Sequence, residues 1–418
     1  NLLTPSEPVS ENRIRTLFSR VKNRLTWMRG DRKLRKMLIN MRKAGAEGDE
    51  EKQELLLQQL LADAAELQTN LSQDDLNQGE EAPIDEIDMA EPKSIQKALM
   101  AQKKKESGSI IKFGWQGLNR MFGPKHGASY GEFCAVAARS HNYKSGLLMD
   151  IARWICVYNK PPETNGLKPI VLFISLENEV QANLTDWYQK LYVNTYHKDP
   201  GCLSNEEIVE YVAREFNKNG FRLLAKRRMG DNFSYHEYEK MVEEDEKKHH
   251  GKVVATILDY ITLCHRLPED SSHNDAVQLQ KLAERFHNHT AHHDIFFFTG
   301  LQLGTDASQL ASSGKHNIVK QYNEFHLADC RGLKRELDFL MAIELEKNHH
   351  NVTWLTAAWL KHRYVHDTPV EDKYFAVRFH KSGIFDDIEG KDTSTRDIYT
   401  VDDSDGDESG QPALDLIF

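Results

Sequence analysis

From Ile110 onward, short apolar runs alternate with segments whose apolar residues recur at helical spacing, and no other feature restricts the fold as strongly. The runs predict strands at Phe133–Ala137, Ile170–Leu176, Val253–Leu258, Ile295–Phe298, Leu340–Ile343 and Trp354–Trp359. Helices are expected between them at Ser145–Tyr158, Glu206–Asn217, Tyr235–Lys248 and Ala276–His289. Strands that alternate with helices are joined by crossovers, so the sequence predicts an α/β domain with a parallel sheet flanked by helices. Ligands bind at the carboxyl ends of strands in such sheets, so the residues that follow each strand are the first candidates for a site.

Composition divides the chain into four parts. We expect an N-terminal helical domain over 1–72, a linker with a short helix over 73–109, the α/β domain over 110–388, and a disordered acidic tail over 389–418. Residues 386–418 hold eleven acidic and two basic residues, which accounts for almost all of the net charge of −10. Residues 13–43 hold twelve Lys and Arg against one acid. The acidic balance therefore does not argue against nucleic-acid binding.

Several classes of protein are disfavoured by composition. No run approaches the roughly 20 apolar residues of a membrane span, and the first residues carry no signal-peptide pattern. The five cysteines are scattered without a C-x-x-C pair, which is typical of reduced thiols in an intracellular protein and argues against zinc. We therefore expect no membrane association and a cytoplasmic location.

The segment after the first long strand has features of a phosphate-binding loop. Such loops place backbone N–H groups at a helix N-terminus, with a lysine for the β- and γ-phosphates and a hydroxyl for Mg²⁺. Lys144 and Ser145 occupy those two places. Both glycines of the usual G-x-x-x-x-G-K-[ST] pattern are replaced, by Ala138 and Tyr143. Tyr143 must accept backbone angles that glycine normally takes, stack on a base or a neighbouring subunit, or mark a slow or inactive ATPase.

Two carboxylates follow later strands. Glu177 comes after the strand at Ile170–Leu176, and Asp259 follows the apolar run Val253–Leu258, as an acid associated with Mg²⁺ does. Each alone could equally be a helix cap or a solvated acid. A loop, a glutamate and an aspartate in this order together predict a nucleotide site at the carboxyl edge of the sheet.

The order of these segments carries a family resemblance. Gly131–Phe133 running into the loop, then Val171–Glu177, then Ile257–Tyr260, together with Phe113–Met121 upstream, resemble the C-terminal domain of DnaB-type replicative helicases. The resemblance covers about 110–385 and implies a RecA-like ATPase that uses ATP or another NTP with Mg²⁺. It further implies a hexameric ring that translocates 5′ to 3′ on single-stranded DNA. The divergent loop and acidic tail suggest a phage-encoded member acting in the host cytoplasm.

The resemblance also implies roles for individual residues. Lys144 and Ser145 would hold the phosphates and Mg²⁺ within a loop completed by Ser140, His141, Asn142, Tyr143 and Gly146. Glu177 would be the base that orients the attacking water, and Asp259 would act on Mg²⁺ through its water shell.

Three further catalytic residues follow from the same resemblance. Gln302 would sense the γ-phosphate, and Lys361 and Arg363 would reach into the neighbouring subunit's site. An arginine supplied by a neighbour can contribute roughly 10³–10⁵ in rate in other NTPases, which explains why a ring would be needed. The alternative for Lys361 and Arg363 is a solvated basic strand end.

A DNA-binding surface is expected after the strand that ends near Gln302. Residues Thr305–Phe325 are expected to form a polar loop whose small and basic residues suit sequence-independent single-strand binding. The candidates in and after this loop are Ser312, Ser313, Gly314, Lys315, Lys320, Arg331, Lys334 and Arg335. The loop after Asp259, with Arg266 and 271–274, is a second candidate, and a mobile surface loop is the alternative for both.

Partners and rival functions remain open at this point. The N-terminal domain could form a collar, the helix Ser94–Lys105 could pack on an adjacent subunit, and the tail ending at Phe418 could dock on a partner. Possible partners are a primase, a loader, a polymerase or a single-strand-binding protein. A RecA/RadA-like recombinase and a catalytically inactive RecA-fold scaffold or loader are the rival interpretations.

Overall fold

The computed structural model describes residues 89–400 except 94, 97–98, 100–107, 197, 199–200, 202, 268–274, 314–316, 328–331, 364–367, 380–385 and 388–391. The chain divides into two compact units, Asn1–Ala101 and Gln102–Phe418. The expected helical domain over 1–72 lies outside the described residues, as does most of the predicted helix Ser94–Lys105. Everything that can be compared with the α/β prediction belongs to the second unit.

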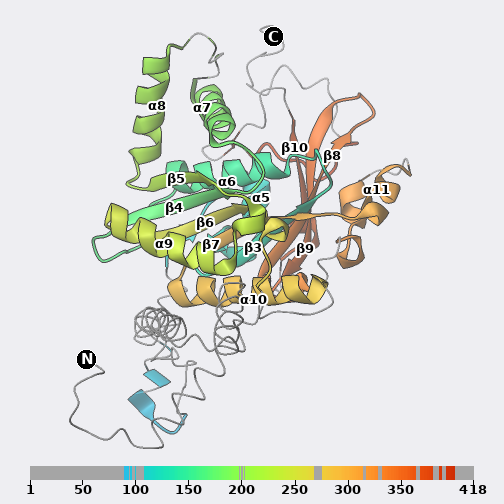
Figure 1. Ribbon diagram of the computed structural model, residues 1–418. Helices are drawn as coiled ribbons and strands as arrows, with labels where there is room; N and C mark the ends of the chain where they lie inside the picture. Colours follow the sequence, from blue (N-terminus) through green and yellow to red (C-terminus); the bar gives the residue numbers. More distant parts are fainter. Residues whose placement is uncertain are drawn as a thin grey trace, which may run out of the picture. The chain divides into compact units, whose positions relative to one another are not determined.

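A mixed sheet forms the centre of the described part of the second unit (Figure 1). Its eight strands have the order β10-β9-β8-β3-β7-β6-β4-β5. The parallel strands are β3 (Phe133–Ala138), β4 (Lys168–Ser175), β5 (Arg222–Arg227), β6 (Gly251–Asp259), β7 (Phe296–Gln302) and β8 (Phe339–Lys347). β9 (Thr353–His362) and β10 (Tyr374–Arg378) join one edge antiparallel. All of the strands predicted from the apolar runs are present, so this part of the prediction is confirmed.

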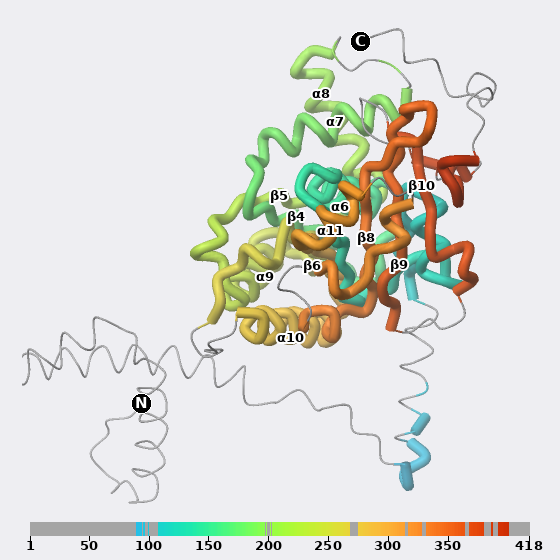
Figure 2. Tube along the Cα trace, turned by 90° about the vertical axis from the view of Figure 1, so that its right-hand side faces the viewer, coloured from blue at the N-terminus to red at the C-terminus, as the bar shows by residue number. Residues whose placement is uncertain are grey.

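Helices cover both faces of this sheet (Figures 1 and 2). One face carries α5 (Gln116–Met121), α6 (Lys144–Tyr158), α7 (Val180–Tyr196) and α8 (Asn205–Asn217). The other carries α9 (Tyr235–His249) and α10 (Asp275–His293), with α11 (Thr305–Ala311) following β7. A separate two-stranded ribbon pairs β1 (Ile110–Ile111) with β2 (Ala128–Ser129). The arrangement is the three-layer α/β/α architecture that alternating strands and helices predict.

The structure differs from the sequence prediction where the hydrophobic signal is weak. β5 and α7 were not predicted, because β5 is a half-buried edge strand and α7 is rich in polar residues. The antiparallel β9 was not foreseen either. The turn over 348–352 that joins β8 to β9 is too short for a crossover and therefore reverses the chain.

The expected polar loop Thr305–Phe325 is wrong in part. Thr305–Ala311 forms α11, and Ile318–Gln321 and Glu324–His326 form short 3₁₀ helices. Ala307 and Val319 are buried in the core, which explains why this segment folds onto the sheet rather than projecting from it.

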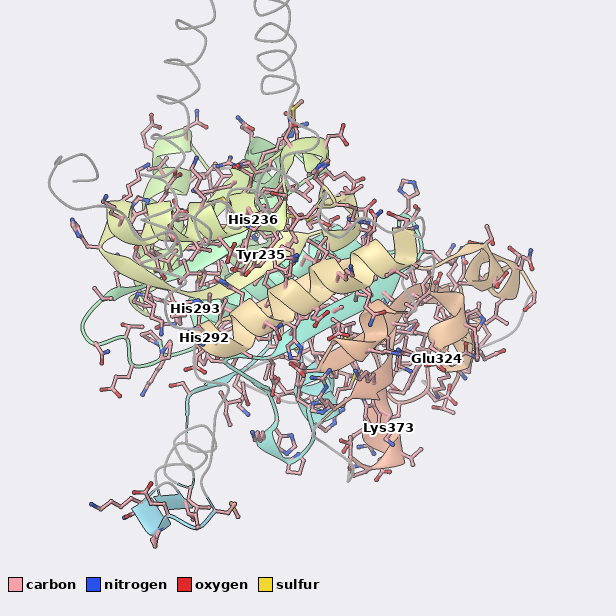
Figure 3. The ribbon with its side chains drawn as sticks, turned by 60° about the horizontal axis from the view of Figure 1, so that its bottom comes forward. Tyr235, His236, His292, His293, Glu324 and Lys373 are labelled. Atoms are coloured by element: carbon pink, nitrogen blue, oxygen red, sulfur yellow. The ribbon has the colours of Figure 1, made fainter. Side chains whose placement is uncertain are left out.

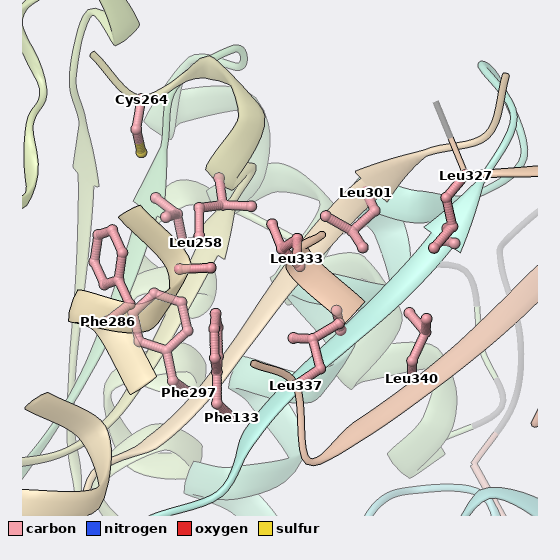
Figure 4. Packing of buried hydrophobic residues seen from close by; sticks show 14 of the residues in the cluster. Phe133, Leu258, Cys264, Phe286, Phe297, Leu301, Leu327, Leu333, Leu337 and Leu340 are labelled. Carbon is pink, nitrogen blue, oxygen red and sulfur yellow. The ribbon is translucent and has the colours of Figure 1, made fainter. Parts of the chain in front are cut away.

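Packing on the α9/α10 face illustrates how the elements are held. Leu279, Leu282 and Phe286 recur on one side of α10 and are buried against the sheet. The ring centroids of Phe286 and Phe297 lie 5.0 Å apart, and Phe297 in turn packs edge-on against Phe133 (Figure 4). Burying such a side chain stabilises the fold by about 1.5–3 kcal/mol. The position of β3 between β7 and β8 is therefore fixed by packing as well as by backbone hydrogen bonds.

The ordered domain extends past Ile388, where the sequence placed its end. Thr395 exchanges backbone hydrogen bonds with Ala376 of β10, and Ile398 is fully buried. The rest of the predicted acidic tail, 389–391 and 401–418, lies outside the described residues. No helix in the described part of the chain is long and apolar enough to cross a membrane.

Candidate nucleotide site

The carboxyl edge of the sheet gathers the residues expected to bind nucleotide. Lys144, Gln302, Asp259 and Glu177 stand at or just after the ends of β3, β7, β6 and β4, which are consecutive neighbours in the sheet. Because parallel strands end at a common edge, residues far apart in the chain meet here.

The loop between β3 and α6 forms without either expected glycine. Ala138 is simply the last residue of β3, and the left-handed conformations fall on His141 (φ 62°) and Tyr143 (φ 61°). Such angles cost a non-glycine residue about 1 kcal/mol or more, so the surroundings must hold them. The phenol of Tyr143 donates a 2.7 Å hydrogen bond to the buried Asp150 on α6.

The loop is also fastened to β8. The Asn142 carboxamide oxygen accepts a 2.9 Å hydrogen bond from the backbone N–H of Leu345. The Arg139 guanidinium forms a two-bond ion pair with Glu344, whose side chain is almost completely buried. Glu344 also accepts a 2.8 Å hydrogen bond from the hydroxyl of Tyr322. Asn142 was predicted to bind nucleotide, but its side chain lies against β8 and positions the loop.

Lys144, at the start of α6, is closely packed by side chains from other elements. Its ammonium nitrogen is 3.5 Å from the centre of the Tyr260 ring and 3.5 Å from the Gln302 carboxamide oxygen. Gln302 in turn donates a 3.1 Å hydrogen bond to the hydroxyl of Ser140. Gly300 leaves room for the lysine, since a Cβ there would lie 2.9 Å from Cδ of Lys144. The structure therefore brings Ser140, Lys144 and Gln302 together.

Asp259 has the features of a residue that meets a cation. It is fully buried, and neither of its carboxylate oxygens has a hydrogen-bond partner within the described residues. Burial raises the pKa of this carboxyl, whereas the nearby Ser145 hydroxyl and Lys144 charge lower it. A buried, unpaired carboxylate beside a hydroxyl fits Mg²⁺, which prefers oxygen ligands.

Few of the described side chains at this position could hold Mg²⁺. The described residues contain no group of three or more His, Cys, Asp or Glu side chains that could hold a metal. Mg²⁺ is commonly bound through one or two protein ligands plus water and substrate phosphates, which agrees with such a sparse site.

Glu177 projects into solvent from the turn after β4. The turn is fixed by a hydrogen bond from the Asn178 N–H to the Ser175 hydroxyl (2.8 Å) and another from the Leu176 N–H to the Asp259 carbonyl (2.8 Å). The charge of Glu177 contributes to the raised pKa of Asp259, so the two carboxylates are close enough to interact. An exposed carboxylate near the phosphate end of the site could contact an attacking water.

Lys361 and Arg363 lie at the amino edge of the sheet, the end at which its parallel strands begin. Lys361 pairs with Leu340 near the start of β8, because β9 runs antiparallel to it. Its ammonium donates to the carbonyls of Lys334 (2.6 Å) and Leu337 (2.6 Å), while Arg363 forms a 3.2 Å ion pair with Asp338. The length of β3, roughly 17 Å, separates this edge from Lys144, so neither residue can serve the site of its own chain.

The predicted DNA-binding residues fall into separate places. Ser312 and Ser313 donate to carbonyls at the end of α11, and Lys320 lies over the Tyr374 ring, 3.8 Å from its centre. Lys334 and Arg335 instead lie at the amino edge, where their carbonyls accept from Lys361 and Arg363. Gly314, Lys315 and Arg331, and residues 271–274 of the second candidate loop, lie outside the described residues.

Comparison with known proteins identifies the family. The model of the divergent DnaB-like ATPase family matches residues 57–407, most of the chain. The chain belongs to the divergent DnaB-like ATPases. This DnaB-like ATPase has no match among curated protein sequences.

Solved structures agree on the fold of this DnaB-like ATPase. One solved ATPase domain is similar with a TM-score of 0.51 and 15% identity, over 70% of this chain and 98% of that one. A DnaB-like replicative helicase, described with its interactions with primase, gives a TM-score of 0.53 and 15% identity, over 82% of this chain and 79% of that one. The mostly parallel sheet flanked by helices is thus the RecA-like ATPase fold expected from the sequence.

Several residues that shape the site of this DnaB-like ATPase were not singled out from the sequence. Glu344, Tyr260 and Asp150 each contact the loop or its lysine from another element. Gly300 carried a usable signal, because glycine inside a strand often marks a close approach by another group. Glu344 and Asp150 carried none, since a lone acid within a strand or helix does not reveal its partner.

Proposed function

We propose that this protein is an ATP-dependent replicative DNA helicase that assembles as a ring and translocates on single-stranded DNA. The observation that carries the proposal is the convergence of Lys144, Gln302, Asp259 and Glu177 at one edge, with an unpaired buried carboxylate at its centre. Membership of the DnaB-like ATPase family supports the same conclusion.

Each side chain takes a defined part in this proposal. Lys144 and the backbone N–H groups at the start of α6 would bind the phosphates of ATP, Ser145 would hold Mg²⁺, and Asp259 would act on the ion through its water shell. Mg²⁺, when bound, neutralises charge on the phosphate oxygens. Glu177 orients the attacking water, and Gln302, already in contact with Lys144, responds to the γ-phosphate.

Hydrolysis at the boundary between subunits explains the place of the basic residues at the amino edge. Lys361 and Arg363 lie too far from Lys144 to act within one chain, so in a ring they would serve the next subunit's site. Reaching it requires Arg363 to exchange its ion pair with Asp338 for a phosphate oxygen. The number of subunits, six by family resemblance, and the 5′ to 3′ direction belong to the same proposal.

The remaining parts of the chain complete the proposal. Residues 1–72 would form a collar and 73–109 a linker that contacts the adjacent subunit, with primase, loader, polymerase or single-strand-binding protein as possible partners. Single-stranded DNA would pass along Ser312, Ser313, Lys320 and the neighbouring 314–316. A phage origin and a location in the cytoplasm are retained from the sequence as part of this proposal.

The test is DNA-stimulated ATP hydrolysis by the intact chain and by Glu177→Gln. We expect the variant to hydrolyse ATP about 10²–10⁴-fold more slowly while binding it with unchanged affinity, because the amide cannot accept a proton. Glu179→Gln is a matched control, since that exposed residue two positions further on pairs with Arg227 and its substitution should leave the rate unchanged. Equal rates for wild type and Glu177→Gln would contradict the motor and favour an inactive scaffold.

Electron microscopy with ATP and single-stranded DNA distinguishes the helicase from the other rival, a RecA/RadA-like recombinase. Closed rings support the helicase, whereas helical filaments would favour a recombinase. Both outcomes can be read from the same purified protein used for the hydrolysis assay.

A further inference from the structure

Tyr143 has a conformation that its residue type disfavours. It is the residue before α6, with φ 61° and ψ 17°, in the left-handed region that glycine occupies freely. Its carbonyl accepts a 2.9 Å hydrogen bond from the Leu147 N–H, so the first turn of α6 depends on these angles. Something other than its own preference must therefore hold Tyr143 in this conformation.

The side chain of Tyr143 supplies the restraint. The phenol folds back along α6 and donates its 2.7 Å hydrogen bond to Asp150, two turns into the helix. Phe379 packs edge-on against the ring, with 5.2 Å between the centroids, and the Lys190 ammonium lies 4.8 Å from the ring centre.

Gly146 makes this path possible. A Cβ on Gly146 would lie 2.4 Å from Cε2 and 2.7 Å from Cδ2 of the Tyr143 ring, closer than any real carbon contact. Glycine is otherwise a poor helix former, because it loses more conformational freedom than alanine when a helix forms. The tyrosine ring and the missing side chain at 146 therefore require each other.

Asp150, which accepts the hydrogen bond from Tyr143, is itself fixed by ion pairs. Asp150 is fully buried and forms ion pairs with Arg153 (3.1 Å) and Lys190 (3.5 Å). Arg153 in turn pairs with Asp386 at 2.5 Å, which ties the network to the C-terminal segment. The phenol is thus anchored to a fixed point, and Asp150 keeps two cationic partners if the phenol is removed.

We propose that Tyr143 is a positioning residue: its hydrogen bond to Asp150 across Gly146 holds the loop in the left-handed turn that glycine would otherwise provide. A side-chain restraint thus takes the place of the conformational freedom expected at 143, and Gly146 accommodates the ring. The inference rests on the proposed function, because the turn matters to nucleotide only if Lys144 and Ser145 bind phosphate.

A double-mutant cycle on the full chain tests the pairing of Tyr143 with Gly146. Binding of Mg²⁺–ADP and the thermal unfolding midpoint are measured for wild type, Gly146→Ala, Tyr143→Gly and the double variant. We expect Gly146→Ala alone to weaken ADP binding at least about tenfold and to lower the midpoint, because its Cβ displaces the ring. In the Tyr143→Gly background the same alanine should change affinity by less than about threefold, a non-additive result that marks direct coupling.

The cycle separates failure of this inference from failure of the proposed function. Equal effects of Gly146→Ala in both backgrounds would overturn the pairing. If wild type bound no nucleotide, the proposed function would fail, while the unfolding midpoints would still report whether the two positions are coupled.

Tyr143→Phe tests whether the hydrogen bond positions the loop or merely stabilises the fold. Loss of one hydrogen bond should raise the KM for ATP about five- to tenfold with kcat little changed, since the strained turn loses its restraint. Tyr143→Gly should be less impaired than Tyr143→Phe, the reverse of the usual order for conservative substitutions, because glycine accepts the turn without strain.

Tyr158→Phe is the matched control. Tyr158, at the other end of α6, donates a 2.6 Å hydrogen bond to Asp386 in the same network but does not touch the loop. Its loss should lower the unfolding midpoint and leave KM unchanged. If Tyr143→Phe kept the wild-type KM, or if Tyr158→Phe raised KM equally, Tyr143 would stabilise the fold without positioning the loop.

Discussion

At the scale of single residues, the site depends on where side chains are absent as much as on where they are present. Gly300 lies in the middle of β7, buried directly beneath Lys144 and Tyr260. Its missing side chain lets the lysine lie close to the strand, with its ammonium over the Tyr260 ring and near Gln302. The position of the lysine is thus set by a residue that has no functional group.

Gly300→Ala should therefore weaken nucleotide binding with only a small effect on stability. The new Cβ would lie 2.9 Å from Cδ of Lys144 and 3.2 Å from Cβ of Tyr260, so the lysine must move. We expect Mg²⁺–ADP affinity to fall about tenfold, as one charge-assisted hydrogen bond is worth roughly 1.5–3 kcal/mol. Titration calorimetry measures the change.

Gly220→Ala provides the control for the effect of substituting a glycine. Gly220 has φ 86° and open space around it in an exposed turn remote from the site. An alanine there should cost about 1 kcal/mol of stability from backbone strain and leave ADP affinity unchanged. Unchanged affinity in Gly300→Ala would contradict the proposed place of Lys144.

At the scale of elements, β8 links the phosphate loop to the segment that follows α11. Glu344 of β8 binds Arg139 of the loop and Tyr322 after the 3₁₀ helix Ile318–Gln321. Two residues further along β8, Glu346 accepts a 2.9 Å hydrogen bond from the Ile318 N–H. The loop and the predicted DNA-facing segment are therefore attached to the same strand, which offers a direct route for coupling the two.

The contact between α9 and α10 is also informative, because it contains several histidines. Tyr235 and His236 lie on α9, and His292 and His293 lie on the neighbouring α10 (Figure 3). Between the helices, His289 is almost fully buried against Tyr235 and Tyr238. Burial and the adjacent His293 lower its pKa to about 4, although Glu239 on α9 acts in the opposite direction.

His289 should make the protein less stable as the pH falls from about 6.5 to about 4. The unfolded chain binds a proton at His289 in this window and the folded chain does not, so protonation favours unfolding. The loss amounts to about 2 kcal/mol at pH 5. Thermal unfolding of His289→Phe should therefore depend less on pH than that of wild type.

The pH dependence of His289→Phe must be compared with that of wild type, because other groups titrate in the same pH range. Burial raises the pKa of Glu132 to about 7, which makes stability fall as the pH rises through that region. His349→Phe, in the exposed turn after β8, should keep the wild-type pH dependence. Identical pH dependence in His289→Phe and wild type would show that His289 is not buried as a neutral ring.

At the scale of the whole molecule, the two sets of proposed catalytic residues lie on opposite edges of one sheet. Lys144, Asp259 and Glu177 are at the carboxyl edge, and Arg363 is at the amino edge beside Asp338. A head-to-tail assembly would bring the amino edge of one protomer to the carboxyl edge of the next, as cyclic rings do. Each complete catalytic site would then be formed by two neighbouring protomers.

Mixing two inactive variants tests this arrangement. Arg363→Ala retains Glu177, and Glu177→Gln retains Arg363, so a boundary that joins the two can contain one complete site. In a random equal mixture about a quarter of the boundaries are complete, and we expect hydrolysis to recover accordingly. No recovery on mixing, with each variant still forming oligomers, would mean that Arg363 does not act on a neighbour.

The sequence by itself determined the order of most strands and helices and the residues that follow the strands. Apolar runs and helical spacing are local signals, and parallel strands necessarily end at one edge, so local patterns were enough to place Lys144, Asp259, Glu177 and Gln302 together. The weakly patterned β5 and α7 could not be predicted, since their hydrophobic signal is small.

Only the tertiary structure decided how these residues are held. Tyr143 reaches Asp150 along α6, Arg139 meets Glu344 from a strand 205 positions away, and Arg363 pairs with Asp338 instead of lying free in solvent. A side chain's partner depends on packing between elements, which neither composition nor spacing encodes. The sequence therefore identified the phosphate-binding loop although both expected glycines are missing, but it could not show which contacts hold the loop in their place.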